Sequence, residues 1–478
     1  MIFDRKPISI VRRLLSAGYE AYIVGGAVRD SLLGKTPKDY DITTIATPEQ
    51  VRHVFGRRKC RIIGRRFRLA LVFEGGDVFE VSTFRREPTM KERHMRQDDE
   101  GAMIWNDNVY GTFEDDVRRR DFTVNALYYD VNRQRIVDRV GGVNDIKSRT
   151  VRCIGEPDTR FVEDPVRMLR ALKLVGQNSF SLSKNIQQAI LAHAQLIQSA
   201  SPARLTEEFM KIMNCDSALG IVEACEKYGF LRFFMPELSR IWDTEGGGLI
   251  RSMLRQHDEC LEEDDDFLSQ RSFAFAVISL PYLLGCMDIE DIVVHRRWAE
   301  ARQQCKASVR KFFECFDVIH EVELDLCDLA IMMPMMMYAK KLPLSLRESP
   351  LYPFAYELFR MLTMATGNLT ERFRKLPFPT DAAANGQADA WNEGDGDNDA
   401  VPENPEAVED AAAERKAKPA GVRRTKSRQE SDSGGRRRKA KPENDSADET
   451  ALDDAPPKPA RRKRRKKKTN EQKPNEEI

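Results

Sequence analysis

Two aspartates separated by one residue are the strongest chemical signal in this sequence. Asp39 and Asp41 lie in Lys38-Asp-Tyr-Asp-Ile-Thr-Thr44, which is typical of the beginning of a β-strand. Residues two apart on a strand point to the same face, so the two carboxylates can lie side by side. Such carboxylates can bind a pair of Mg²⁺ ions, which stabilises both the attacking and the leaving oxygen of a phosphoryl transfer. The spacing therefore predicts metal binding and catalysis by Asp39 and Asp41.

A phosphate-binding pattern precedes these aspartates, in Val24-Gly-Gly-Ala-Val-Arg-Asp30. Gly25 and Gly26 allow a triphosphate to approach the backbone at the start of a helix, where amide N–H groups favour anions. Arg29 can pair with phosphate oxygens through its guanidinium. Each pattern is common by itself, but the two in this order and this close together are specific. We expect Gly25, Gly26 and Arg29 to bind a nucleotide.

Three later stretches extend the pattern: Arg119-Arg-Asp-Phe-Thr-Val-Asn-Ala126, Glu163-Asp-Pro-Val-Arg-Met-Leu-Arg-Ala171 and Arg204-Leu-Thr-Glu-Glu208. With the aspartates, they resemble the nucleotidyltransferase core of the DNA polymerase β superfamily. The resemblance is closest to the class II branch, which holds bacterial poly(A) polymerases and tRNA CCA-adding enzymes. It implies an enzyme that adds nucleotides to RNA 3′ ends without a nucleic-acid template, with ATP as substrate and two Mg²⁺ ions.

A two-metal site usually needs a further carboxylate, and two candidates exist. Glu80 lies in an apolar strand, where a bare carboxylate is costly unless it serves such a site. Asp121 follows a basic run, and capping of a helix is its alternative role. The resemblance ranks Asp121 in the catalytic set and Glu80 as a supporting acid, and the choice between them stays open.

The resemblance also implies which residues contact the nucleotide. Arg120 and Asn125 match nucleotide-binding positions, although Arg119 and Arg120 can instead neutralise the acids just before them. Asp164, Arg167 and Arg170 match a protein template that hydrogen-bonds the incoming base. Their spacing of three residues places them on one side of a helix that begins near Pro165, so an exposed row of ion pairs is the alternative.

The stretch Gly64-Arg-Arg-Phe-Arg-Leu-Ala-Leu-Val72 separates the two possible activities. It is similar to poly(A) polymerases, whereas CCA-adding relatives usually carry a flexible element rich in Gly, Thr and His there. Leu71 departs from the pattern, since many of the polymerases have His at this position. The resemblance favours polynucleotide adenylyltransferase activity over CCA addition, and it implies RNA contact by Arg65 and Arg66.

The chain is expected to be an α+β protein. Strands are predicted at residues 21–24, 40–44, 60–63, 69–73 and 78–84, with a capped helix starting at Thr47. They predict a five-stranded mixed-sheet head over residues 1–154. Helical spacing then predicts a neck over residues 155–240, which carries the elements that bind the base and RNA, and a body with a distal region over residues 241–379.

Composition changes after Pro379, and residues 380–478 are expected to be a disordered tail, acidic and then strongly basic. Its clusters are typical of phosphate-backbone binding, although localisation or solubility are alternative roles. RNA binding is expected at five consecutive basic residues: Arg461, Arg462, Lys463, Arg464 and Arg465.

Bulk properties favour a cytoplasmic protein. The sequence has no run of about 18 apolar residues and no signal-peptide core at its start. Its nine cysteines form no Cys-x-x-Cys pair. The expected partners are the 3′ ends of mRNA and small RNA, with RNA-degradation factors as an open possibility. His257-Asp258 resembles the HD dipeptide of phosphohydrolases, but we expect it on a solvated helix without a metal.

Overall fold

The computed structural model describes residues 3–64, 68–87, 95–97, 103–105, 109–261, 270–339, 341–368, 370–377 and 379. For residues 95–97 and 103–105 the backbone alone is described. Arg65, Arg66 and the predicted RNA-binding run Arg461–Arg465 lie outside the described residues, as does the tail. The chain divides into two units, Met1–Arg415 and Lys416–Ile478, and all of the described residues belong to the first.

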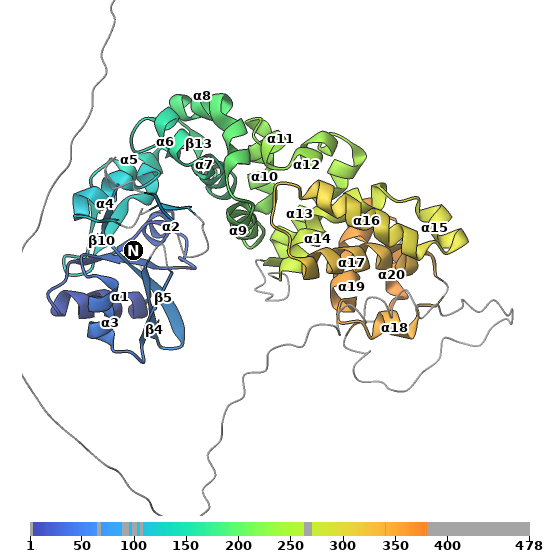
Figure 1. The fold of residues 1–478 in the computed structure, drawn as a ribbon, viewed down its shortest axis with the longest axis horizontal. Helices are drawn as coiled ribbons and strands as arrows, with labels where there is room; N and C mark the ends of the chain where they lie inside the picture. Colours follow the sequence, from blue (N-terminus) through green and yellow to red (C-terminus); the bar gives the residue numbers. More distant parts are fainter. Residues whose placement is uncertain are drawn as a thin grey trace, which may run out of the picture. The chain divides into compact units, whose positions relative to one another are not determined.

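A seven-stranded mixed sheet forms the centre of the head, with the strand order β11-β10-β1-β2-β5-β4-β3 (Figure 1). Its strands are β1 (Ala21–Val24), β2 (Asp41–Thr44), β3 (Cys60–Ile63), β4 (Leu69–Glu74), β5 (Asp77–Thr83), β10 (Leu127–Asp130) and β11 (Arg135–Asp138). β2 and β5 are parallel, and the other neighbours are antiparallel. The five predicted strands are all present, but the expected count was wrong because β10 and β11 extend the sheet beyond β1.

Two N-terminal helices cover one face of this sheet. α1 (Arg5–Ser16) packs on β1 and β2, and α3 (Pro48–Phe55) packs on β3, β4 and β5. Helix α3 begins as predicted, since Thr47 and Gln50 form a reciprocal capping box and Pro48 occupies the first turn. The apolar stripe of α1, which includes Ile10 and Leu14, is buried against the sheet.

The opposite face is covered over only part of its width. α4 (Phe113–Arg119) places Val117 against Val24 and Tyr128, which form a small second core over β1 and β10. Over β5, β4 and β3, alternate side chains on this face are exposed or half-buried, and on β2 Asp41 is exposed while Thr43 is buried. The catalytic aspartates predicted from the sequence lie where the covered half ends.

Short elements surround the sheet. They are α2 (Gly26–Leu32), β6 (Arg85–Arg86), β7 (Met95–Gln97), β8 (Met103–Trp105), β9 (Val109–Tyr110), the 3₁₀ turn η1 (Thr123–Asn125) and α5 (Gly142–Lys147). β6 pairs with β9, and β7 pairs with β8.

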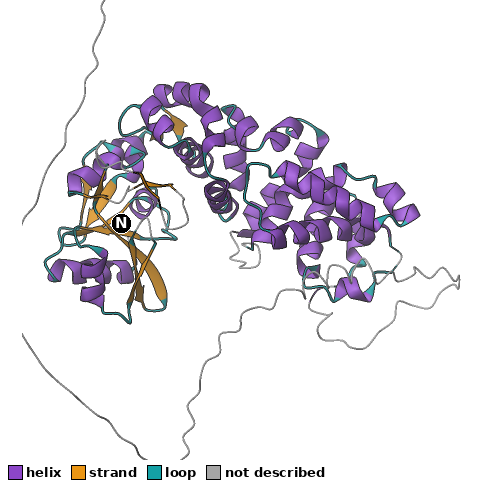
Figure 2. Ribbon diagram, viewed as in Figure 1, coloured by secondary structure: helices purple, strands orange, loops and turns teal. Residues whose placement is uncertain are grey.

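The rest of the described chain is almost entirely helical (Figure 2). The first elements are β12 (Thr150–Val151), α6 (Pro157–Glu163), α7 (Val166–Asn178), β13 (Ser181–Leu182), α8 (Lys184–His193), η2 (Ala194–Ser199), α9 (Pro202–Met213), α10 (Ala218–Lys227), α11 (Leu231–Phe234) and α12 (Pro236–Ile241). The later ones are α13 (Glu245–Leu261), α14 (Arg271–Gly285), α15 (Ile289–His295), α16 (Trp298–Phe312), α17 (His320–Tyr338), α18 (Leu344–Arg347), α19 (Tyr352–Thr366) and α20 (Thr370–Arg374). An α+β fold is therefore confirmed, while the boundaries of neck and body remain predictions.

Helix α14 is the central helix of the later region, and it is buried from Ser272 to Leu284. Within the described part of the chain, no single helix is long and apolar enough to cross a membrane. α14 and α15 meet that criterion only as a pair, across a bend of 78°.

His257 and Asp258 on α13 are not solvated, which corrects the expectation from the sequence. His257 is fully buried, and its ring lies parallel to that of Phe273. Asp258 accepts hydrogen bonds from the backbone N–H groups of Ala218 and Leu219, at 2.8 and 3.0 Å. The carboxylate thus caps the N-terminus of α10, and the dipeptide has a structural place in the helical region.

Candidate active site

The carboxylates predicted for catalysis lie at the start of β2. Asp41 is its first residue, whereas Asp39 precedes the strand, so the expectation that both stand on the strand was partly wrong. Asp41 pairs directly with Glu80 of the parallel strand β5, and directly paired residues have side chains on the same face. The fold therefore brings Glu80 beside Asp41 from 39 residues further along the chain.

These acids repel one another. Partial loss of water raises the pKa of Asp41, and Asp39 raises it further, while Arg120 and Lys211 oppose the rise. Partial desolvation and the charge of Asp41 likewise raise the pKa of Glu80. The site thus gathers negative charge that the surrounding protein does not fully neutralise.

Gly25 lies against these carboxylates. Its φ of +76° belongs to the left-handed region that favours glycine. A Cβ at this position would lie 3.7 Å from Nη1 of Arg120 and 3.9 Å from Oδ2 of Asp41. The first glycine of the predicted phosphate-binding pattern therefore sits between a candidate metal ligand and a guanidinium.

Arg120 is fixed by a buried acid. Asp116 is fully buried, and its Oδ2 accepts hydrogen bonds from Nη2 of Arg120 at 3.0 Å and from the Tyr128 hydroxyl at 2.9 Å. The Arg120 Nε also donates to the Tyr128 hydroxyl, at 2.8 Å. Arg119 uses the same carboxylate, with Nε 2.9 Å from Oδ1. Arg119 and Arg120 thus neutralise Asp116, which was the alternative role considered from the sequence. The same contacts orient Arg120 toward Gly25.

A chain of polar contacts joins the other predicted nucleotide-binding residues of the head. Arg29 donates from Nη1 to Oδ1 of Asn125 at 2.8 Å, and Asn125 donates from Nδ2 to Oδ1 of Asp121 at 3.3 Å. Asp121 also accepts from the N–H of Phe122 at 2.7 Å, and its Oδ2 lies 4.0 Å from Nη1 of Arg170. Asp121 therefore faces Asn125 and Arg170, whereas Glu80 is the acid aligned with Asp41.

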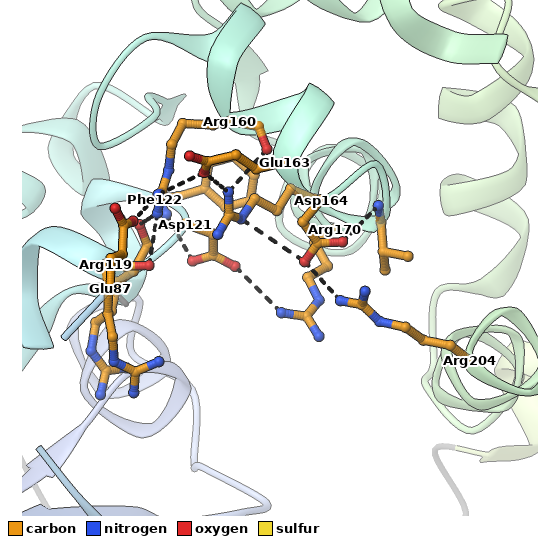
Figure 3. A network of polar contacts seen from close by, with 12 residues as sticks. Glu87, Arg119, Asp121, Phe122, Arg160, Glu163, Asp164, Arg170 and Arg204 are labelled. Carbon is orange, nitrogen blue, oxygen red and sulfur yellow. Dashed lines mark hydrogen bonds and ion pairs between the residues drawn. The ribbon is translucent and has the colours of Figure 1, made fainter. Parts of the chain in front are cut away.

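The predicted base template belongs to a dense network of ion pairs (Figure 3). Asp164 lies just before α7, not on it, and its Oδ1 accepts the N–H of Val166 at 3.2 Å. Its Oδ2 accepts from Nη2 of Arg204 on α9 at 2.7 Å, and Nε of Arg167 lies 4.0 Å away. Burial alone would raise the pKa of Asp164, but the Arg204, Arg167 and Arg170 guanidiniums hold it below its ordinary value.

Arg170 extends the network to α9. Its Nη2 donates to Oε1 of Glu208 at 3.1 Å, and Lys211 donates to the same oxygen at 3.2 Å. Burial opposes ionisation of Glu208, yet Arg170 and Lys211 keep its pKa low. Asp164, Arg167 and Arg170 are therefore brought together as predicted, but as members of a paired network.

Arg160 of α6 links this network to the head. Its side chain is only 7% exposed, and Nη2 donates to the backbone carbonyls of Arg119 and Arg120 at 2.7 and 2.9 Å. Nη1 contacts Glu87 and donates to Oε2 of Glu163 at 3.1 Å. Arg160 thus holds the end of α4, and with it the segment that carries Arg120 (Figure 3).

Four of these residues received no role from the sequence: Asp116, Arg160, Arg204 and Glu208. Arg204 and Glu208 stood inside a recognised stretch, but their partners lie 40 and 38 residues away, beyond the reach of local spacing. Asp116 gave one signal, since it stands four residues before Arg120 on a helical pattern.

Two family models match the chain. Residues 21–152 match the poly A polymerase head domain, and residues 179–241 match the probable RNA and SrmB-binding site of polymerase A.

Curated relatives match the same part. Poly(A) polymerase I of Haemophilus influenzae is 44% identical over 254 residues, which cover 53% of this chain and 56% of the relative. Poly(A) polymerase I of Salmonella typhi is 41% identical over 260 residues, with the same coverage. The CCA-adding enzyme of Lactobacillus helveticus is 39% identical over 207 residues, or 43% of this chain and 49% of the relative. The chain spans about half the length of the curated relatives it matches.

Solved structures extend the likeness to most of the chain. The CCA-adding enzyme of Bacillus stearothermophilus in complex with CTP has a TM-score of 0.53 at 24% identity, covering 87% of this chain and 89% of that one. A tRNA nucleotidyltransferase complexed with a primer tRNA and an incoming ATP analogue gives 0.52 at 22% identity, over 76% and 96% of the chains. By sequence, residues 21–152 thus match a poly A polymerase head domain and residues 179–241 match a polymerase A RNA-binding region, while the solved structures show that most of the chain shares the fold of CCA-adding enzymes.

Proposed function

We propose that this protein is a template-independent polynucleotide adenylyltransferase, which transfers AMP from ATP to RNA 3′ ends. In this reaction the RNA 3′-hydroxyl attacks the α-phosphorus of ATP and pyrophosphate leaves. The observation that carries the proposal is the alignment of Asp41 with Glu80, beside Gly25 and Arg120. Identities of 44% and 41% to poly(A) polymerase I, against 39% to a CCA-adding enzyme, support adenylate addition over CCA addition.

The carboxylate site fits Mg²⁺. The residues Asp41 and Glu80 are exposed to solvent at their surface. Partial desolvation raises the pKa of both carboxyl groups, Asp39 adds to the rise at Asp41, and Asp41 and Asp39 add to it at Glu80, as expected of acids that lack a bound cation. Among the described residues, no three His, Cys, Asp or Glu side chains form a ready-made metal cage. Mg²⁺ commonly uses one or two carboxylates together with substrate phosphates, so an incomplete protein site suits it. Asp39 and Asp41 would hold Mg²⁺, which when bound supplies charge stabilisation for phosphoryl transfer.

We assign Glu80 as the acid that completes this site. It shares a register position with Asp41, whereas Asp121 is engaged by Asn125 and lies near Arg170. Asp121 then acts as a positioning residue, because its contact with Asn125 orients the amide that also accepts from Arg29. Arg120 and the backbone at Gly25 and Gly26 bind the triphosphate.

The network of α7 and α9 selects the base. Asp164 can accept from an exocyclic amine, and the donors of Arg167 and Arg170 can meet ring nitrogens. Arg204 holds Asp164, Glu208 holds Arg170 and Glu163 holds Arg167 before a nucleotide arrives, so their geometry is preorganised. A base that cannot satisfy them leaves buried polar groups unpaired, which lowers its affinity.

RNA and ATP are the proposed partners, and the name of the matched region adds an SrmB-like protein. A cytoplasmic location, and RNA contacts by Arg65, Arg66 and the basic tail, remain predictions.

Primer extension with each nucleoside triphosphate alone tests the proposed function. We expect pure protein with Mg²⁺ to extend a generic RNA with ATP and not with CTP. The second substrate is a tRNA that lacks its 3′ end. Ordered incorporation of CTP and then ATP on that tRNA, without extension of the generic RNA, would instead establish CCA addition.

A further inference from the structure

A row of side chains leads from the candidate carboxylates to the edge of the head sheet. The strand register pairs Asp41 with Glu80, Glu80 with Leu71, and Leu71 with Arg61. Directly paired residues share a face, so the four side chains lie on one side of β2, β5, β4 and β3. Neighbouring strands are about 4.8 Å apart, which places Arg61 about 14 Å from Asp41.

This face is apolar beside the row and open to solvent. Val78 and Ile63, which stand two residues from Glu80 and Arg61 on their strands, are 50% and 44% exposed. Phe73, two residues from Leu71, is half-buried. Helices α1 and α3 pack on the other side of the sheet, so they do not cover these residues (Figure 1).

An arginine and an aromatic ring are already stacked here. The Arg61 guanidinium carbon lies 5.4 Å from the centre of the Phe73 ring. Arg61 also lines a shallow hollow at the sheet edge with Arg52 and Arg57. The row is thus acidic at Asp41 and Glu80 and basic at its far end.

An acidic end and a basic end match the chemistry of an RNA strand. An RNA whose 3′-hydroxyl lies at the acidic end would carry its next phosphates toward the basic end. Unpaired bases stack on aromatic rings and on guanidinium planes, which requires no particular sequence. A polymerase that extends varied RNA ends needs contacts of this kind.

We propose that the face formed by Ile63, Leu71, Phe73, Val78 and Arg61 binds the RNA nucleotides that precede the 3′ end. Phe73 and Arg61 stack on bases, and Arg61 attracts phosphate. The inference rests on the proposed function for the position of the 3′ end. It adds an RNA subsite in the head to the RNA-binding region matched at residues 179–241.

The test measures the affinity of the full-length protein for labelled RNA by fluorescence anisotropy. Oligoadenylates of two lengths are used, one too short to reach from Asp41 to Arg61 and one that spans the row several times. Phe73→Ala should weaken binding of the long RNA about fivefold or more, the lower range for loss of one stacked base. Arg61→Ala should weaken it and reduce the slope of log affinity against log salt. Phe73→Trp should restore binding, because it restores a stacking surface.

Arg12→Ala is the matched control. Arg12 is an exposed cation on α1, the helix on the other side of the sheet, and its loss removes the same charge. Thermal melting of each variant identifies misfolding, and Phe73→Leu replaces Phe73→Ala if the latter melts early. Long-RNA affinities of Phe73→Leu and Arg61→Ala equal to wild type would overturn the proposal. The proposal would also be overturned if Arg12→Ala weakened long-RNA binding as much as Arg61→Ala does. It would be overturned as well if the Phe73 and Arg61 variants lost as much affinity for the short RNA as for the long RNA.

This readout is independent of catalysis. If the protein adds no nucleotide but the variants lose long-RNA affinity as expected, the RNA subsite stands and the proposed function fails. If adenylate addition occurs and the affinities are unchanged, the proposed function stands and the subsite fails. Occupation of this face by a protein partner belongs to the second outcome, because RNA binding would then be unaffected.

Discussion

The paired carboxylates of β2 and β5, Asp41 and Glu80, and the acids of the α7–α9 network, Asp164 and Glu208, are held in opposite electrostatic states. Asp41 and Glu80 have raised pKa values and lie close to like charge. Asp164 and Glu208 have lowered pKa values and accept hydrogen bonds from arginine or lysine. Acids of both kinds belong to the same unit of the chain, yet nearby arginine and lysine side chains hold the pKa below its ordinary value only in the second pair.

Under the proposed function, this difference separates a site that substrate completes from one that is built in advance. Asp41 and Glu80 would gain their counter-charge from metal and bound nucleotide, so their unfavourable state would be relieved only during function. The network acids are satisfied in the free protein, which fixes donors for a base before it arrives. Mutations in the first region should therefore affect catalysis more than stability, and those in the second should affect both.

The largest effect is expected from Asp41→Asn. It removes a candidate metal ligand while keeping the size of the side chain, so nucleotide addition should fall by about 10³-fold or more. Single-turnover extension of RNA with ATP measures the rate. Glu74→Gln, which removes a carboxylate paired with Lys59 on the same sheet, is the control and should retain activity. Activity of Asp41→Asn within tenfold of wild type would refute the assignment.

Arg160→Ala should instead destabilise the fold. Its loss leaves Glu163 without one ion pair and the carbonyls of Arg119 and Arg120 without their donor. We expect unfolding to become easier by about 2–4 kcal/mol, since partners of a buried charge become unpaired. The measurement is the denaturant midpoint of unfolding.

Arg160→Lys should recover only part of this loss, because an ammonium cannot reproduce the fork of donors. Arg133→Ala removes an exposed guanidinium whose Nη1 lies 3.7 Å from Oδ2 of Asp130, and it should cost less than about 1 kcal/mol. Equal denaturant midpoints for Arg160→Ala and Arg133→Ala would show that the buried contacts of Arg160 do not stabilise the fold.

The two regions also differ in how far the sequence predicted them. The carboxylates and glycines were readable because their chemistry lies within about 20 residues, and β1 and β2 bring them together as expected. Glu80 was a candidate because a bare carboxylate in an apolar strand is costly, and the family resemblance ranked it as a supporting acid. Its alignment with Asp41 depends on the register of β2 and β5. Local patterns contain no information on which strands become neighbours.

The network was predicted only in its central members. Asp164, Arg167 and Arg170 follow one another on a helical spacing, whereas Arg204 and Glu208 approach them from α9 through tertiary packing. The strands β10 and β11 were missed for a related reason. Each is four residues long. Pairing with β1 across about 100 residues places β10 in the sheet, and β11 then pairs with β10.

Arg167→Ala tests whether the network reads the base. If Arg167 contacts the nucleotide, the ratio of kcat/KM for ATP to that for CTP, GTP or UTP should fall at least about tenfold. Glu163→Gln weakens the ion pair between Arg167 of α7 and Glu163 at the end of α6, at 3.1 Å, without removing the guanidinium. If Arg167→Ala and Glu163→Gln gave the same kcat/KM ratios between nucleotides, Arg167 would have only a structural role in its ion pair.

The smallest effect is the pH dependence of stability, where the two regions should behave with opposite sign. The pKa of Asp41 is raised above its ordinary 3.8 in the folded protein, so its ionisation costs stability. Without Mg²⁺, Asp41→Asn should therefore be more stable than wild type at neutral pH, by less than about 1 kcal/mol, the scale of exposed charge interactions. The advantage should shrink as the pH falls through the raised pKa and vanish below the ordinary 3.8, where Asp41 is protonated in the unfolded chain as well.

Glu208→Gln should show the reverse. The pKa of Glu208 lies below its ordinary 4.5, so this carboxylate contributes stability above pH 4.5 that is lost as the pH falls through the lowered pKa. The Glu208→Gln variant should be less stable than wild type at neutral pH, and the two stabilities should converge in acid.

Thermal midpoints of wild type, Asp41→Asn and Glu208→Gln between about pH 3 and 7, first with chelator and then with Mg²⁺, measure both trends. Mg²⁺ should raise the midpoint of wild type more than that of Asp41→Asn, because only wild type keeps the full ligand set. Destabilisation of Asp41→Asn in chelator at neutral pH would show that Asp41 is already paired in the free protein, and the contrast between the two regions would fail.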